Sequence, residues 1–220
     1  MKLTRPALCL ALVASVTAAT AATAATRPRP KPLKPVCNVV VDPAGDASPQ
    51  PPAPSDDSFD VLSADIASDA KNVTAVIRMK NVSSTGLGQL GRDVQMTFDL
   101  VGAEAKVWIG YTGSSYGGDA FQYGLIGMGD AGSTSPTGDA VGKIDAAKNE
   151  IRMTVPVADL NGLGKIKPGA KVSSIAVTAS QLVGVAPNPS GVYAFNSFTV
   201  DDAAAVKPYI AGYPSCVKPG

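Results

Sequence analysis

The sequence predicts an all-β fold, an antiparallel β-sandwich of the jelly-roll type in a single domain. Apolar and polar residues alternate in short runs along most of the chain, and clusters of glycine and proline separate these runs. No convincing amphipathic helix interrupts the pattern, apart from one helical turn expected at residues 157–161. Many short strands with regular turns are typical of sandwiches and jelly rolls.

The first clear run, residues 72–80, places alternate apolar side chains on one face, which is the pattern of a half-buried strand. Later runs repeat this period of two. The side chains expected to point inward are Val73, Ala75, Ile77, Met79, Val94, Met96, Phe98, Leu100, Ala105, Val107, Ile109, Tyr111, Ile151, Met153, Val155, Ile175, Val177 and Ala179. Residues 143–145 and 150–152 predict a hairpin across residues 146–149.

Three parts are expected along the chain: a signal peptide at residues 1–26, a tether at 27–35 and the sandwich domain at 36–220. The leader begins with basic residues, continues with an apolar run and ends in small residues that offer Ala-x-Ala sites, a pattern of bacterial style. A membrane anchor is the alternative, but the run is shorter than the about 20 residues that a spanning helix needs. We therefore expect a secreted protein with no membrane insertion after signal cleavage.

The tether alternates proline with basic residues, which favours an extended, solvated spacer. Six of the 19 basic residues precede residue 36, which leaves 13 against 18 acidic residues and a net charge of −5 for the domain. A domain of that sign is a poor nucleic-acid binder. The basic tether itself allows weak attraction to an anionic cell envelope.

Two cysteines remain once Cys9 leaves with the leader. Cys37 and Cys216 flank almost the whole domain of a protein addressed to an oxidising compartment, so we expect them to form a disulfide. Closing a loop of about 180 residues stabilises a fold by up to roughly 5 kcal/mol in the chain-entropy model. A reactive or metal-binding pair is the alternative, although the chain has no histidine to complete a zinc site.

An acidic motif at the start of the domain predicts a calcium site. Asp42 and Asp46 flank Gly45 in one turn, and Asp60 opens the next expected strand, where strand pairing can bring it close to Asp46. Carboxylate oxygens and a glycine that permits a sharp turn are what a calcium loop needs. The alternative is an Asx-turn in which the two aspartates of the first turn accept hydrogen bonds from backbone amides.

Short motifs resemble a known superfamily of β-sandwiches. They are Val-Asp-x-x-Gly-Asp at residues 41–46, Phe-Asp-Val at 59–61, the strand and turn at 153–160, and the acidic ending at 199–203. The pattern resembles the superfamily of the glucodextranase C-terminal domain, DOMON-like domains and family 9 carbohydrate-binding modules. The resemblance implies a jelly-roll-like sandwich with structural calcium and, in some members, a sugar-binding face. It implies Asp42, Asp46 and Asp60 as ion ligands, with Asp201 as a further candidate.

A sugar site would need exposed aromatic rings. Trp108 alternates with Val107 and Ile109, so it is expected on the outer face of its sheet, near Tyr116 and Tyr123, where the three rings could stack on the apolar face of a sugar. The alternative is that Trp108 packs on the core of its sheet. Haem binding of the DOMON type is not expected, since the chain lacks histidine.

Catalysis is not expected, because the absence of histidine removes the commonest general base and every Ser-His-Asp or Cys-His arrangement. A pair of carboxylates could serve a glycosidase, but the aspartates cluster at turns, where ion binding or capping is favoured over the raised pKa of an acid catalyst. The expected function is a secreted, non-catalytic module for a glycan or cell-envelope polymer. The alternative is a structural or protein-interaction domain without a small ligand.

Overall fold

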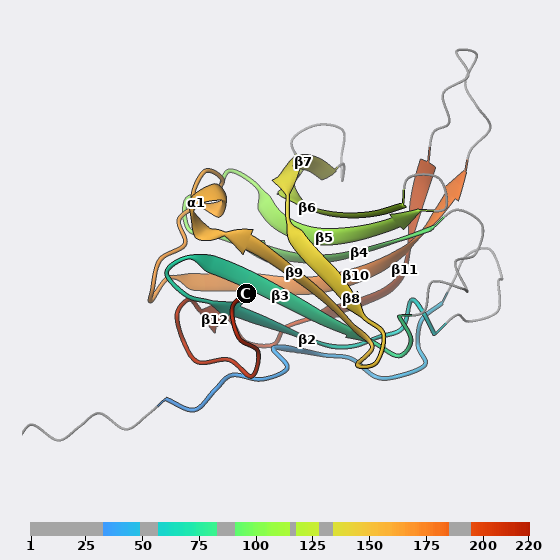
Figure 1. Ribbon diagram of the computed structural model, residues 1–220, viewed down its shortest axis with the longest axis horizontal. Helices are drawn as coiled ribbons and strands as arrows, with labels where there is room; N and C mark the ends of the chain where they lie inside the picture. Colours follow the sequence, from blue (N-terminus) through green and yellow to red (C-terminus); the bar gives the residue numbers. More distant parts are fainter. Residues whose placement is uncertain (1–32, 49–56, 83–90, 115–117, 128–133, 185–194) are drawn as a thin grey trace, which may run out of the picture. The chain divides into compact units, whose positions relative to one another are not determined.

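The computed structural model describes residues 33–48, 57–82, 91–114, 118–127, 134–184 and 195–220. These residues form an antiparallel β-sandwich of two sheets, one packed against the other, which confirms the expected fold class (Figure 1). The expected signal peptide and most of the tether lie outside the described residues. Within the described ranges, none of the helices has the length and apolar character to cross a bilayer.

The smaller sheet has five strands in the order β1-β2-β3-β9-β8, and the larger has six in the order β11-β10-β4-β5-β6-β7, with β12 paired to β10 as its seventh. The strands of the smaller sheet are β1 (Val40–Val41), β2 (Val61–Ser68), β3 (Asn72–Met79), β8 (Val141–Asp145) and β9 (Glu150–Pro156). Those of the larger sheet are β4 (Gly91–Asp99), β5 (Lys106–Ser114), β6 (Gly118–Ile126), β7 (Thr134–Asp139), β10 (Lys171–Gly184), β11 (Phe195–Ala204) and β12 (Tyr209–Ile210).

The core lies between the two sheets and consists of the side chains that the alternation predicts. All of those side chains are buried except Ala105, which precedes β5 and is half-buried. The strand register explains this, because inward residues face one another across neighbouring strands, as Ile77 does with Ile151 and Met96 with Ile109. Such cross-strand apolar pairs stabilise a sheet and fix its register.

Two local predictions are also confirmed. The hairpin joins β8 to β9 with Asp145 opposite Glu150, and Asn149 in the connecting turn has a positive φ of 52°, a conformation that asparagine tolerates. The expected helical turn is α1 (Val157–Leu160), which buries Leu160.

A buried arginine at one end of the core was not predicted. Arg92 is fully buried, and its guanidinium donates to the carbonyls of Ser58 at 3.2 Å and Val82 at 2.7 Å. Its Cζ atom lies 5.5 Å from the ring centroid of Tyr111, in the geometry of a cation–π contact. Within the described part of the chain no carboxylate pairs with it, so backbone carbonyls and an aromatic ring solvate this charge.

Candidate metal centre

The expected disulfide is present and joins the two ends of the domain. Cys37 and Cys216 are separated by 179 residues in sequence, and their Cα atoms are 5.1 Å apart. Backbone hydrogen bonds accompany the bridge, since the amide of Val36 donates to the carbonyl of Pro214 at 2.9 Å and the amide of Cys216 donates to that of Val36 at 3.2 Å. The N-terminal segment therefore reaches β1 in a fixed position.

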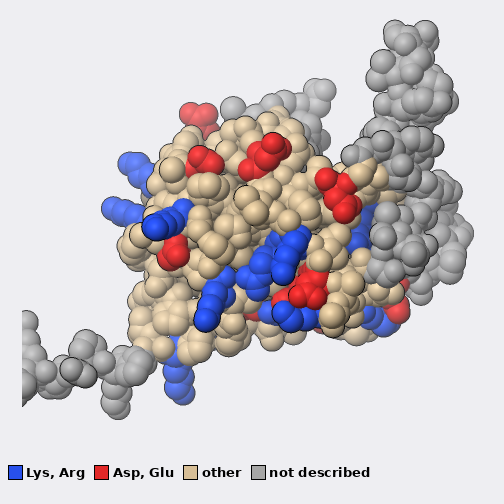
Figure 2. Space-filling view, viewed as in Figure 1, with Lys and Arg blue, Asp and Glu red and all other residues tan. Residues whose placement is uncertain are grey.

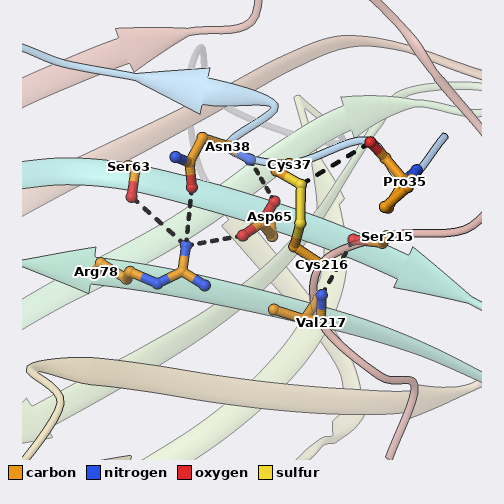
Figure 3. A network of polar contacts seen from close by, with 9 residues as sticks. All are labelled: Pro35, Cys37, Asn38, Ser63, Asp65, Arg78, Ser215, Cys216 and Val217. Carbon is orange, nitrogen blue, oxygen red and sulfur yellow. Dashed lines mark hydrogen bonds and ion pairs between the residues drawn. A yellow bond between two sulfur atoms is a disulfide. The ribbon is translucent and has the colours of Figure 1, made fainter.

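A charged network next to the disulfide fixes the same segment to the smaller sheet (Figure 3). Asp65 on β2 is buried and accepts a hydrogen bond of 2.5 Å from the amide of Asn38. Arg78 on β3 donates to Asp65 at 2.7 Å and to the side-chain oxygen of Asn38 at 3.2 Å. Charge-assisted bonds of this length are stronger than neutral ones. They hold the chain two residues before β1 and thus position the aspartate that follows it.

Three aspartates from separate segments meet at this edge of the sandwich. Asp42 directly follows β1, Asp46 lies in the next turn, and Asp201 comes from β11 near the other end of the chain. Each offers one carboxylate oxygen, and the three oxygens lie within 4.8 Å of one another. The amide of Asp42 donates to the carbonyl of Leu62 at 3.1 Å, so the first carboxylate is anchored on β2.

The turn between the first two aspartates depends on a glycine. Gly45 has a φ of +90°, a conformation that residues with a side chain rarely adopt, and its amide donates to Oδ2 of Asp60 at 2.7 Å. Asp60, the residue before β2, is 1% exposed. The amide of Val61 donates to Oδ2 of Asp201 at 2.7 Å, which draws β11 to the same place. Three of the four predicted ligands thus bring their oxygens together, and Asp60 lies beside them, bound to the amide of the turn glycine and outside the close group.

The electrostatics of this cluster are unfavourable without a cation. Burial, followed by repulsion from Asp201 and Asp46, raises the pKa of Asp42 to about 7. Burial also raises the pKa of Asp201, and the carboxylates of Asp46 and Asp60 add to that rise. Oδ2 of Asp42 and Oδ1 of Asp60 are buried without a hydrogen-bond partner among the described residues. Buried carboxylate oxygens of this kind are expected to have a ligand.

Calcium fits this donor set. Calcium binds carboxylate and carbonyl oxygens at 2.3–2.6 Å, so two of its ligands lie at most about 5 Å apart. The three aspartate oxygens, which all lie within 4.8 Å of one another, meet that limit. A cation borders the cluster on one side: Lys80, whose Nζ atom lies 2.8 Å from Asp57 and 3.5 Å from Oδ2 of Asp60. Lys80 thus compensates one side of the cluster, and the described residues show no ion pair to Asp42, Asp46 or Asp201.

The raised pKa gives the metal-free protein a defined pH dependence. Folding raises the pKa of Asp42 from 3.8 to about 7, so its contribution to stability is full below pH 3.8 and is lost as the pH rises through 7. In chelator, the free energy of unfolding by urea is therefore expected to be lower at pH 8 than at pH 5. Asp42→Asn should reduce this difference in the free energy of unfolding. If Asp42→Asn instead keeps the pH dependence of the unchanged protein, ionisation of Asp42 does not destabilise the fold.

The expected aromatic platform is not formed by Trp108 and Tyr123. Trp108 lies on the face of β5 opposite Val107 and Ile109, but it is only 3% exposed, and its ring lies against Gly110, where an added Cβ would be 3.1 Å from the indole. Tyr123 is opposite Ile109 on the inner face and is 7% exposed. Adjacent register positions point to opposite faces of a sheet, so these two rings cannot share a surface. Tyr116 lies outside the described residues.

Sequence reasoning missed the side chains that support the centre. Asp65 and Arg78 fall on the polar face of predicted strands, where a solvated role is the usual expectation. The one feature that could have indicated their ion pair is that a carboxylate and a guanidinium occupy outward positions of neighbouring strands. That feature becomes informative only when the register of the two strands is known. Lys80 gave no signal at all, because its partners precede β2 and are distant in sequence.

Comparison of the chain with protein-family models, with curated proteins and with solved structures found no match.

Proposed function

We propose that the protein is a secreted, non-catalytic binding module whose sandwich is stabilised by one calcium ion, and that it associates with a glycan or polymer of the cell envelope. The observation that supports the calcium assignment is the convergence of Asp42, Asp46 and Asp201 within 4.8 Å, with a buried and unpartnered oxygen on Asp42. The disulfide between Cys37 and Cys216 supports an oxidising compartment.

The centre supports a structural role for the ion. Its ligands connect the segment after β1, the start of β2 and the middle of β11, so an ion there would join both sheets at one edge. The chain contains no histidine, and two carboxylates of the centre, Asp60 and Asp201, already accept backbone amides. A catalytic acid or base needs a carboxyl group free to exchange a proton with substrate. Asp60 and Asp201 each have one oxygen engaged in the fold instead.

A structural or protein-interaction domain remains the second candidate, and one observation favours it. The burial of Trp108 and Tyr123 removes two of the three rings that were expected to stack on a sugar. Without these rings, the binding of a glycan would depend on hydrogen bonds and charge.

The proposed function is tested by binding of the full secreted chain to an array of envelope and plant glycans, in calcium and in chelator. We expect binding to at least one glycan class in calcium and weaker binding in chelator, because loss of the ion loosens the fold. Absence of binding to every glycan, by protein whose calcium-dependent melting shows that it is folded, would favour the second candidate.

A further inference from the structure

A groove crosses the outer face of the smaller sheet, on the side remote from the core. It has a volume of about 370 Å³ and follows β8 and β9 next to the C-terminal segment. Its side chains come from Asn72, Val141, Lys143, Arg152, Thr154 and Pro156. The backbone of Gly220 also lines it, accepting a hydrogen bond from the side chain of Asn72 and donating one to the hydroxyl of Thr74. Figure 2 looks onto this face and shows basic side chains gathered near its middle, beside an acidic group.

Two cations lie directly opposite each other in this groove. Lys143 on β8 pairs in register with Arg152 on β9, and both side chains point away from the core, since the alternate residues Ile144 and Ile151 point into it. Like charges at directly opposed positions destabilise a sheet. Neither cation has a carboxylate within 4.0 Å in the described ranges. One NH group of Arg152 donates to the carbonyl of Lys218 at 3.1 Å, which fixes the direction of the guanidinium.

The nearby acids offset this pair only in part. The adjacent cross-strand pair, Asp145 and Glu150, does not line the groove. Asp145 forms its ion pair with Lys148 at 3.3 Å; that bond lowers the pKa of Asp145, and Lys143 adds to this lowering from a greater distance. The groove therefore presents two cations without a direct ion pair, on a domain whose net charge is −5 as counted from residue 36 onward.

We propose that this groove binds an acidic polysaccharide, with a uronate carboxylate held between Lys143 and Arg152. This assignment rests on the proposed function and names its ligand class. A carboxylate placed between the two cations removes their repulsion, and the planar guanidinium still has N–H groups free of Lys218 that can form paired bonds with it. Charge complementarity thus selects an anionic ligand over a neutral one.

The rest of the groove fits the remaining parts of a sugar chain. Val141 is 77% exposed and Pro156 is also exposed, and both offer apolar surface for the C–H faces of sugar rings. Thr154 supplies a hydroxyl for hydrogen bonds to the sugar, and this hydroxyl lies 2.9 Å from that of Thr74, which holds it in place. The side-chain amide of Asn72 already donates to the carbonyl of Gly220. A groove that follows two strands suits an extended polymer better than a compact ligand.

The test is calorimetric titration of the full chain, at fixed free calcium, with a glucuronate oligosaccharide and with its carboxyl-reduced, neutral counterpart. We expect binding of the acidic chain alone, weakened by added salt. Lys143→Gln and Arg152→Gln should each weaken it about tenfold, because one charge-assisted contact is worth about 1.4 kcal/mol. Lys171→Gln, an equal charge change at an exposed position of β10 away from the groove, should change affinity less than twofold.

Several results would overturn the proposal. One is an unchanged affinity for the glucuronate chain in Lys143→Gln and Arg152→Gln. Another is binding of the neutral chain as tight as that of the glucuronate chain. A third is equal or tighter binding of a polyphosphate of similar length. If a glycan from the array binds and the two groove variants bind it as the unchanged protein does, the module function stands and the groove assignment fails. If the calcium-dependent melt is also absent, the proposed function fails separately.

Discussion

Removal of the disulfide is expected to lower the free energy of unfolding by about 3–5 kcal/mol, the upper value being that of the chain-entropy model for a loop of this size. The Cys37–Cys216 bridge spans 179 residues, so it restricts nearly the whole unfolded domain. For a domain of this size, about 2–4 °C of melting temperature corresponds to each kcal/mol, so the double variant Cys37→Ser/Cys216→Ser should melt about 6–20 °C lower.

Thermal melts of the double variant and of the reduced protein provide the measurement. Both should fall by a similar amount, and reduction should leave the double variant unchanged. The loss should also weaken calcium binding, because the bridge and the Asp65–Arg78 network position the segment that leads to Asp42. A variant that melts within 2 °C of the unchanged protein would contradict a stabilising role for the bridge.

Calcium is expected to raise the melting temperature by about 5–10 °C. A ligand at one hundred times its dissociation constant stabilises the folded state by about 2.7 kcal/mol, and the temperature change follows from the size of the domain. The physical reason is that the ion replaces repulsion among Asp42, Asp46 and Asp201, whose oxygens lie within 4.8 Å. Magnesium should have a smaller effect, because it demands shorter bonds and a stricter octahedral geometry.

One variant separates calcium binding from general destabilisation. Asp42→Asn removes a charge from the cluster, so at pH 8 in chelator it should be more stable than the unchanged protein, yet respond little to calcium. Asp202→Asn is the matched control, since Asp202 is exposed and its neighbour Asp201 is the ligand. The control should keep the full response to calcium, and loss of that response in Asp202→Asn would argue against a local site.

Most of the fold could be predicted because period-two patterning is a local signal. The inward positions from Val73 to Ala179 were read from alternation alone, and the structure buries all of them except Ala105. Strand order could not be read in this way. Nothing in the chain sequence near β9 indicates that it pairs with β3, about 70 residues away, because such pairing depends on the packing of the whole sheet.

The residues of the candidate centre could be predicted from the sequence, but the hydrogen bonds that surround them could not. Asp42, Asp46 and Gly45 form a motif within five residues, and the ending that contains Asp201 was placed with them by resemblance. The sequence could not show that the amides of Gly45 and Val61 bind Asp60 and Asp201. The aromatic prediction could not place Trp108 and Tyr123 correctly from sequence, because rings near one another in sequence need not share a face, and the register places Tyr123 opposite Ile109.

The most direct test of the calcium centre is a calorimetric titration of calcium into chelator-stripped protein. We expect one ion bound per chain, with the same affinity in Asp202→Asn and an affinity at least one hundredfold weaker in Asp42→Asn and in Asp201→Asn. Asn at position 201 keeps an oxygen that can accept the amide of Val61, so that variant should still fold. No binding by the unchanged protein, or equal affinity in all four proteins, would contradict a calcium ion at this centre.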